Sequence, residues 1–564
     1  MSKVVQEATT QLKEAVMEAL GRAVAAGELS AAPIPAFTVE IPADRSHGDY
    51  AANVALVSAK ALRQPPRKIA EAIVRFLVLD GTYFDRAEIA GPGFINFFLG
   101  GRYYAAVLAD IAALGHAYGR SDYGKGESVL VEFVSANPTG PMHMGNARGG
   151  ALGDCLAAVL DAAGYRVSRE FYVNDAGNQI DKFAASLNAR YLQIYRGEAA
   201  VAFPEDGYQG EDIKDRAKEF AAENGDRYLN APEAERKKAL VDFALPRNIE
   251  KMKSDLAKYR IHYDRWFLES ELHQTGQVAD TIALLKDKGM TYEKEGALWY
   301  RATAAGGEKD EVLIRANGNP TYFAADIAYH RNKFAVRGFD RCIDVWGADH
   351  HGHVARMKGA MDAIGLDGNK LDIVLMQLVR LVQGGEVVRM SKRTGKAIQL
   401  ADLLDEVPVD AARFLFNMRE SNSQMEFDLD LAVQQDAQNP VYYVQYAHAR
   451  ICSILKALTA EGIAPRGCAE SELMLLTAPE ERELIRHLAA YTGEIVGAAK
   501  DYDPARITRY VITLANLFHK FYNACRVKGV EDSLSQARLA LCLAVRTVIR
   551  NVLRMFNVTA PDNM

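Results

Sequence analysis

The stretch that decides the fold is Glu132-Phe-Val-Ser-Ala-Asn137-Pro-Thr-Gly140-Pro-Met-His143-Met-Gly145-Asn146. It begins within an apolar run, Ser128 to Phe133, of the kind that forms a buried strand in a parallel sheet. Two prolines and two glycines then shape a tight loop, and we expect a helix from about Gly145 to Ala163. This order predicts an α/β domain built on a parallel sheet.

The start of that helix is a candidate phosphate site. Free backbone N–H groups and the positive end of the helix dipole meet there, and a glycine at position 145 lets a nucleotide approach the backbone closely. His143 and Asn146 lie one helical turn apart, and both can donate hydrogen bonds to a triphosphate. These features predict a site for the phosphates of a nucleotide at the start of this helix. A His-x-Gly pattern alone is weak support.

A second stretch, Arg389-Met390-Ser391-Lys392-Arg393-Thr394-Gly395-Lys396, carries four cations in eight residues. Taken alone, it is best interpreted as a solvated surface turn. However, a His-x-Gly helix start followed about 245 residues later by a Met-Ser-Lys loop resembles the paired signature of class I aminoacyl-tRNA synthetases. The resemblance implies that ATP is bound by Pro138, Gly140, His143, Gly145, Asn146, Met390, Ser391 and Lys392. It also implies that Lys392 stabilises charge on the transferring phosphates, together with His143 and Asn146.

The resemblance narrows to the arginyl-tRNA synthetases, and it spans essentially the whole chain. The segments that carry it are 135–149 (SANPTGPMHMGNARG), 172–179 (YVNDAGNQ), 322–329 (YFAADIAY), 346–352 (WGADHHG), 439–450 (NPVYYVQYAHAR) and the C-terminal LRMFNVTAPDNM; Asp44-Arg-Ser-His47-Gly-Asp49-Tyr50 resembles the family's N-terminal domain. The implied reaction forms arginyl-adenylate from L-arginine and ATP, then transfers arginine to the terminal ribose of tRNA, releasing AMP and pyrophosphate. The family needs bound tRNA before it activates its amino acid, and we expect the same here.

We expect a fold of three parts. Residues 1–115 form an α+β, tRNA-contacting domain, and residues 116–435 form the Rossmann-like catalytic domain, with a helical insertion at about 195–265. Residues 436–564 form an all-helical anticodon-binding domain. The sequence supports this division, because the middle region is polar and charged, and helix follows helix from Asn439 onward.

Two positions depart from the family pattern. Asn146 stands where a histidine is commonest, and Arg389 and Arg393 replace the usual first lysine and last serine of the second motif. An asparagine still donates a hydrogen bond, so we expect ATP binding to be tuned and not lost. Lys392 is retained.

An arginine substrate brings a planar guanidinium with five donors, which calls for carboxylates placed for paired hydrogen bonds. The resemblance implies that Tyr322 and Asp326 line the pocket, on one face if their segment is helical. Glu269 is a further acidic position, and Glu132 and Asn137 hold the ammonium and carboxylate ends of the substrate. Considered singly, Asp326 could be a helix charge and Tyr322 a packing residue.

The adjacent residues Asp349, His350 and His351 form the most metal-like cluster in the sequence. Neighbouring histidines point in different directions, so we favour a sheet-end loop that contacts substrate, with His350 in the arginine site, over a metal site. We predict no protein-bound metal, and Mg²⁺ that arrives with ATP. The six cysteines are widely spaced, which favours buried free thiols over zinc knuckles or disulfides.

The charge is distributed unevenly. The chain has a net charge of −6. The segment from Arg506 to Arg554, however, contains nine basic residues and only two acidic ones. Arg546, Arg550 and Arg554 recur at every fourth position and form a basic stripe suited to tRNA phosphates, although any one of them could be an ordinary solvated residue. Tyr442, Tyr443 and Tyr446 could stack on unpaired bases or pack in the core.

The composition is that of a globular protein, with 49% hydrophobic and 25% charged residues. No run approaches the roughly 18 apolar residues that would span a membrane, and the N-terminus predicts an amphipathic helix and not a secretion signal. We expect a cytoplasmic monomer whose partners are tRNA and L-arginine, without an editing domain, because a guanidinium is hard to mimic.

Two other functions fit part of the sequence. A nucleotidyltransferase with the same sheet would not need the helical, basic C-terminal third. A non-catalytic RNA-binding relative would have no reason to keep His143, Gly145 and Lys392 together.

Overall fold

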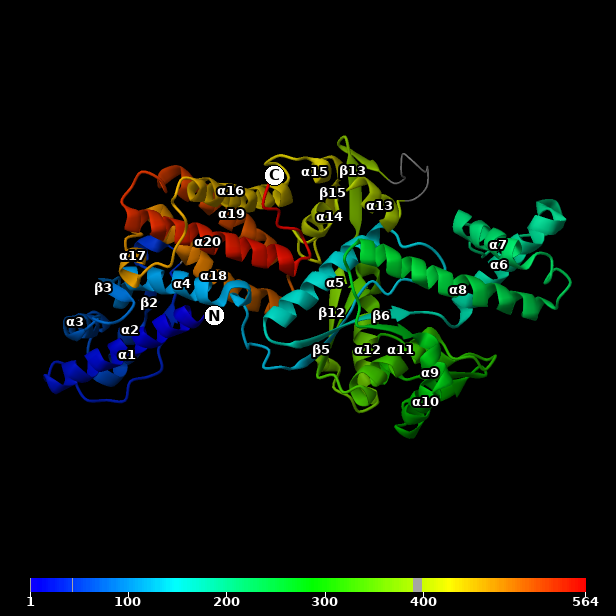
Figure 1. Cartoon of the computed structure of the whole chain (residues 1–564). Coiled ribbons are helices and arrows are strands. Elements are labelled where there is room, and N and C mark those ends of the chain that lie inside the picture. The colour runs from blue at the N-terminus through cyan, green and yellow to red at the C-terminus, as the bar shows by residue number, and fades with distance from the viewer. Residues whose placement is uncertain (1, 43, 389–397) are drawn as a thin grey trace.

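The computed structural model describes residues 2–42, 44–388 and 398–564 (Figure 1). The second motif, with Arg389, Met390, Ser391, Lys392 and Arg393, lies outside the described residues. No helix among the described residues is long and apolar enough to cross a membrane.

A five-stranded parallel sheet forms the centre of the catalytic region, as the sequence predicted. Its strands are, in order across the sheet, β12 (Leu371–Met376), β11 (Arg341–Gly347), β5 (Ser128–Glu132), β6 (Arg166–Val173) and β7 (Arg265–Leu268). The middle strand β5 is buried along most of its length, since both faces of the sheet are covered. Helix α5 (Met144–Ala162) follows β5, within two residues of the predicted bounds.

Two small sheets extend this core, and the sequence did not predict either. An antiparallel sheet consists of β8 (Thr291–Lys294), β9 (Ala297–Tyr300) and β10 (Glu311–Ile314). A mixed sheet consists of β13 (Val379–Gln383), β14 (Glu386–Val388) and β15 (Met425–Asp428). The buried guanidinium of Arg148 on α5 joins the mixed sheet to the core, because it donates to the carbonyls of Gln377, Glu420 and Ser423 at 2.7 to 3.1 Å.

The helical insertion is larger than predicted. It comprises α7 (Glu211–Asn224) and α8 (Glu233–Lys258), but α6 (Asn178–Arg196) packs with them and not against the sheet. Phe183 and Tyr191 of α6 share one apolar cluster with Phe220 and Leu240 of the two later helices. The three helices therefore form a separate lobe beside the sheet (Figure 1).

The N-terminal region is a four-stranded antiparallel sheet covered by helices. Its elements are α1 (Lys3–Ala25), β1 (Val39–Glu40), β2 (Tyr50–Ala52), α2 (Val54–Leu62), α3 (Pro66–Phe76), β3 (Phe84–Ala90) and β4 (Phe94–Leu99). Helix α4 (Gly101–Leu114) leaves this region and packs on the C-terminal helices. An ion pair of 2.6 Å between Asp49 and Arg486 joins the same two regions.

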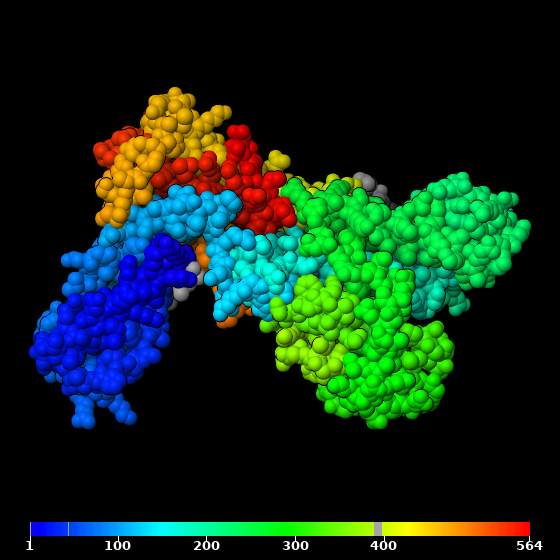
Figure 2. All heavy atoms as spheres, turned by 60° about the horizontal axis from the view of Figure 1, so that its bottom comes forward, coloured from blue at the N-terminus to red at the C-terminus, as the bar shows by residue number. Residues whose placement is uncertain are grey.

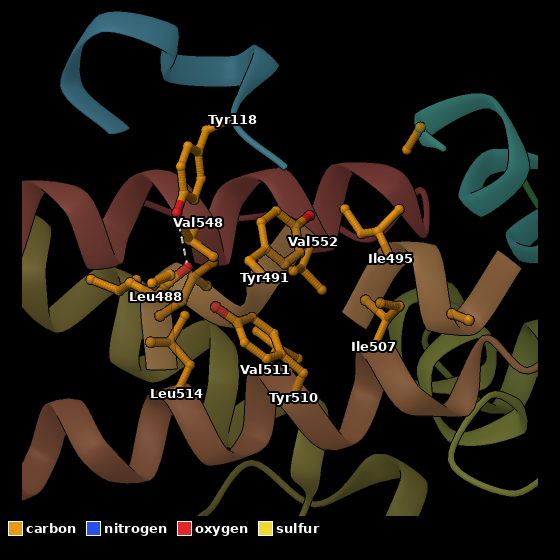
Figure 3. Close-up of a cluster of buried hydrophobic side chains, with 14 of the residues drawn as sticks. Tyr118, Leu488, Tyr491, Ile495, Ile507, Tyr510, Val511, Leu514, Val548 and Val552 are labelled. Atoms are coloured by element: carbon orange, nitrogen blue, oxygen red, sulfur yellow. Dashed lines mark hydrogen bonds between the residues drawn. The ribbon is translucent and has the colours of Figure 1, made fainter. Parts of the chain in front are cut away.

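The C-terminal region is helical, as predicted. Its helices are α16 (Pro440–Ala460), α17 (Glu470–Leu473), α18 (Pro479–Asp501), α19 (Ala505–Ala524) and α20 (Asp532–Met555). Figure 3 shows Tyr118, from the segment after α4, directed into the apolar cluster of these helices beside Tyr491 and Val548. Its hydroxyl donates to the carbonyl oxygen of Leu488 at 3.0 Å. This contact anchors the start of the catalytic region on the C-terminal helices.

The molecule is elongated. Figure 2 shows the N-terminal region and the helical insertion at opposite ends, with the sheet and the C-terminal helices between them. A long surface of this kind can contact an extended partner at several separate places.

Candidate active site

The carboxyl ends of the parallel strands converge on one set of polar side chains. Glu132 ends β5, Tyr172 lies near the end of β6, Glu269 directly follows β7, and Asp344 lies in β11. Ligands of open α/β sheets bind at this edge. A cavity of about 530 Å³ opens there, and its lining includes Glu132, Ser135, Asn137, Tyr172, Tyr322, Asp326, His330, Asp344, His350 and His353.

Helix α5 begins at this edge with a reciprocal cap. The Nδ1 atom of His143 accepts a hydrogen bond from Gly145 N at 3.1 Å, and Asn146 Oδ1 accepts one from His143 N at 2.9 Å. Because Nδ1 is an acceptor, the neutral ring carries its proton on Nε2, which remains available as a donor. Partial desolvation lowers the pKa of His143 and favours this neutral form. A Cβ atom on Gly145 would lie 3.0 Å from Cε1 of the same ring, so the glycine makes room for it.

The start of α5 pairs with the segment that begins at residue 398. The backbone of His143 forms an antiparallel bridge with Gln399, and Leu400 N donates to Met142 O at 2.9 Å. In the sequence, Gln399 follows the second motif by three residues. A hollow of about 620 Å³ lies alongside, lined by His143, Met144, Val379, Arg380, Leu381, Val387, Val388 and Ile398. Its apolar walls and single histidine suit a nucleotide base and its phosphates.

The loop between β5 and α5 contains backbone strain. Val134 and Ser135 both have positive φ, 71° and 40°, which is a rare conformation for a β-branched residue. In the strained turn the Ser135 hydroxyl donates to Glu132 Oε1 at 2.8 Å, and the Ser135 hydroxyl oxygen accepts from Tyr172 N at 3.1 Å. Strain at this point therefore fixes Glu132 at the cavity wall.

The other predicted loop residues differ in accessibility. Asn137 is exposed and lines the cavity. Pro138 is buried, and its carbonyl accepts from Asn248 of α8 at 2.9 Å, so it shapes the loop. Gly140 lines a third hollow, between the loop and the helical insertion.

Tyr322 and Asp326 lie on α11 (Tyr322–Arg331), which is helical as their spacing required. The hydroxyl of Tyr322 accepts from Gln179 N at 3.1 Å, which ties α11 to the start of α6. Asp326 is half-buried, and its carboxylate lies 3.4 Å from Nε2 of His353. Sequence reasoning missed His353, which faces the cavity from a different helix.

Glu269 is buried and begins the short helix α9 (Glu269–Gln274). Its carboxylate accepts from the Tyr172 hydroxyl at 2.9 Å. Burial raises the pKa of Glu269 to about 7, and the nearby charge of Asp326 adds to the rise. Glu269 lines a neighbouring hollow of about 390 Å³ that shares Tyr322 with the main cavity. Tyr322 thus lines both the cavity that contains Asp326 and the hollow that contains Glu269.

A buried charge cluster supports the cavity floor, and sequence reasoning missed it. Lys333 donates to Glu132 Oε2 at 2.6 Å and to Asp344 Oδ1 at 2.9 Å. Asp344 also contacts Nε2 of His330 at 2.9 Å. One signal was present in the sequence, because Asp344 is an isolated carboxylate inside an apolar strand.

Asp349, His350 and His351 are all exposed. Asp349 and His350 both line the cavity, with their side chains 3.7 Å apart, but His351 is not part of its lining. Within the described residues, the one group with three donor atoms close together is His448, Cys452 and Asp562. Arg550 pairs with Asp562 at 3.3 Å there, and a neighbouring cation disfavours a metal ion.

All six cysteines are free thiols, as predicted. Burial was also predicted for all six, but only four are buried. Cys155, Cys342, Cys525 and Cys542 are buried, whereas Cys452 and Cys468 are partly exposed. Cys452 and Cys468 both lie in the helical C-terminal region, where neighbouring segments leave part of each residue accessible to solvent.

The predicted basic stripe lies on α20. Arg550 and Arg554 are exposed and Arg546 is half-buried. Tyr443 of α16 is half-buried and packs against the main core, whereas Tyr446 is exposed. Both rings also contact His519, with ring centroids 5.3 and 6.1 Å away.

The fold and the paired motifs define a class I aminoacyl-tRNA synthetase. A family model described as the catalytic domain of class I (R) tRNA synthetases matches residues 110–453. Models of the arginyl-tRNA synthetase N-terminal domain and of the DALR anticodon binding domain match residues 10–99 and 444–564. The chain belongs to the arginyl-tRNA synthetase family.

Full-length relatives agree with this assignment. The arginine–tRNA ligases of Ruminiclostridium cellulolyticum and Caldanaerobacter subterraneus are 56% and 57% identical over 564 residues, which is 100% of each chain. A crystal structure described as an arginyl-tRNA synthetase of Campylobacter jejuni matches with a TM-score of 0.74 and 33% identity. That match covers 83% of this chain and 100% of the other.

Proposed function

We infer that the chain is an ATP-dependent arginine–tRNA ligase. One observation carries the inference: a single short loop joins Glu132, in the cavity wall, to the helix start that presents His143. Asp326 lines the same cavity, and Glu269 lines the adjoining hollow. A triphosphate and a doubly cationic amino acid can therefore lie side by side. The expected first step is attack of the arginine carboxylate on the α-phosphorus of ATP, a reaction that needs mainly positioning and charge neutralisation.

The nucleotide end uses both motifs. We propose that Nε2 of His143 and the amide of Asn146 donate to the phosphates, with Gly140, Gly145, Met390 and Ser391 around them. Pro138 shapes the loop, and Lys392 stabilises the charge that develops on the phosphates. The pairing of His143 with Gln399 supports this arrangement, because Gln399 follows the second motif closely in the sequence.

The arginine end uses the cavity. We propose that Glu132 binds the ammonium, that Asn137 binds the carboxylate, and that Asp326 and Glu269 bind the guanidinium along Tyr322. His350 covers the opening. The i, i+4 placement of Tyr322 and Asp326 on one helix supports this, since both face the same cavity. A lysine side chain would leave acceptors unpaired in such a site.

The remaining regions would bind tRNA. Arg546, Arg550 and Arg554 lie along α20 with two of the three exposed, which suits phosphate contacts near the anticodon. Residues 1–115 would contact the tRNA elbow, residues 116–435 would catalyse, and residues 436–564 would bind the anticodon. The elongated shape supports this division (Figure 2). We further propose that the protein is a cytoplasmic monomer, that Mg²⁺ enters with ATP, and that no metal is held for structure.

The test of this function is charging. Purified protein, ATP, Mg²⁺ and total tRNA should esterify labelled arginine to tRNA but not labelled lysine or glutamine. Charging with lysine at a comparable rate, or charging with none of the three, would remove the assignment. A nucleotidyltransferase without tRNA would instead use ATP and release pyrophosphate with no charged tRNA.

The reaction should depend on the protonation of Glu269. The pKa of this carboxyl is raised to about 7 in the free protein, so below that pH it takes up a proton and loses its charge. We expect kcat/KM for arginine to fall by up to about tenfold per pH unit as the pH drops below 7. His143 does not account for this change, because its pKa is lowered and not raised.

The measurement is arginine kcat/KM between pH 6 and 8.5, with kcat/KM for ATP as the internal control. In Glu269→Gln the inflection near pH 7 should disappear. A profile that is the same in the wild type and the variant would exclude Glu269 from the guanidinium site.

A further inference from the structure

Lys333 is the most completely buried cation at the cavity. Its side chain is 0% exposed, although the Glu132 side chain that it contacts is 10% exposed and faces the cavity. Lys333 lies in a π-helical turn, Asn332–Val336, that follows α11. Such turns are rare and often mark functional sites. A substrate in the cavity can therefore contact Glu132 but not Lys333.

The ammonium of Lys333 is shared between two carboxylates. It lies 2.6 Å from Glu132 Oε2 and 2.9 Å from Asp344 Oδ1, and the two acids come from neighbouring strands. Asp344 has a second partner in His330, whereas Lys333 is the cation that pairs with Glu132 among the described residues. Because a buried charge is costly without a partner, Glu132 depends on Lys333 to remain charged.

The protonation behaviour of the cluster agrees with this geometry. Burial by itself would lower the pKa of Lys333, but Asp344 and Glu132 outweigh it, and the pKa lies above its usual value. Burial raises the pKa of the Glu132 carboxyl, and Lys333 opposes that rise. Without Lys333, Glu132 would take up a proton more readily.

The cluster also reaches the other end of the cavity. His330 contacts Asp344 through Nε2 at 2.9 Å and the backbone oxygen of Asp326 through Nδ1 at 2.7 Å. A carbonyl oxygen only accepts, so Nδ1 is the donor. The helix that carries Asp326 is thus held to the same cluster as Glu132.

We propose that Lys333 is a positioning residue for the α-ammonium group of the amino acid: it holds the Glu132 carboxylate charged and facing the cavity. Ser135 holds the other oxygen of that carboxylate at 2.8 Å, so both oxygens are oriented before the substrate arrives. This role rests on the placement of the substrate ammonium at Glu132 in the proposed function. Lys333 itself contacts neither substrate.

The experiment uses two analogues that each lack one end of arginine. Agmatine retains the ammonium-bearing carbon chain without the carboxylate, and 5-guanidinopentanoate retains the carboxylate without the ammonium. Their inhibition constants are measured against arginine in tRNA charging by the full-length protein. In Lys333→Met we expect the arginine KM and the agmatine Ki to rise by about 30-fold or more. The Ki of 5-guanidinopentanoate should change by less than about twofold, which a general loss of structure would not allow.

A second variant and a comparison keep the test decisive. Lys333→Gln retains hydrogen-bond donors without the charge, so this variant should fold even if Lys333→Met does not. It should also raise the Ki of agmatine while leaving the Ki of 5-guanidinopentanoate nearly unchanged. A folded Lys333 variant that weakens both analogues equally, or neither, contradicts the inference. If Glu132→Gln in that case still raises the Ki of agmatine and not that of 5-guanidinopentanoate, only the role of Lys333 fails. If Glu132→Gln changes both Ki values alike, the placement of the substrate ammonium at Glu132 fails as well.

Discussion

Replacing Asp326 with asparagine should raise the KM for arginine by about 100-fold, because an amide cannot offer two acceptors and a charge to the guanidinium. Asparagine has the same shape, so α11 and its link to Gln179 should remain. The ATP KM at saturating arginine should stay unchanged. Steady-state charging kinetics with varied arginine measure this directly.

The matched control is Asp287→Asn. Asp287 is an exposed carboxylate at the end of α10 (Gln277–Asp287) in the same region of the chain, so its loss changes the net charge equally. We expect less than a twofold change in the arginine KM, as for most surface substitutions. Unchanged arginine KM in Asp326→Asn would show that the guanidinium lies elsewhere.

Replacing His143 with asparagine should lower kcat for adenylate formation by about 100-fold or more, which is the usual cost of removing a donor to developing charge. Asparagine can still cap α5, since it is among the preferred N-cap residues, but it lacks the Nε2 donor that His143 presents. Single-turnover formation of arginyl-adenylate measures the loss.

The comparison with His143→Ala separates catalysis from folding. Alanine removes both the donor and the cap, so the same kinetic loss should come with about 1 kcal/mol of lost helix stability. Thermal melting should therefore be unchanged in the asparagine variant and shifted in the alanine variant. A wild-type rate in His143→Asn would exclude the histidine from the reaction.

Much of the candidate active site was predictable from the sequence, because the local preferences of its residues for strand, turn or helix agree with the structure that they adopt in the fold. The strand that ends at Glu132, the helix that starts after His143 and the helical spacing of Tyr322 and Asp326 all follow from periodicity and turn residues. The three-part organisation followed from the family resemblance and from a change of pattern along the chain.

What was missed depends on tertiary structure. Lys333 occurs in an ordinary polar context, and only the π-helical turn directs it inward. The positive φ angles of Val134 and Ser135 cannot be inferred from residues that normally avoid them. Helix α6 precedes the segment predicted as a helical insertion, and its packing against α7 and α8 depends on an apolar cluster formed only in the folded chain.

The most direct test of the central claim is ATP–pyrophosphate exchange with the purified protein, with arginine and tRNA added separately and together. The assignment predicts exchange with arginine and tRNA together, and none with lysine or glutamine in place of arginine. Exchange with arginine alone would retain the ligase but remove its dependence on tRNA. Folded protein that shows no exchange under any of these conditions would contradict the assignment and favour a non-catalytic RNA-binding protein.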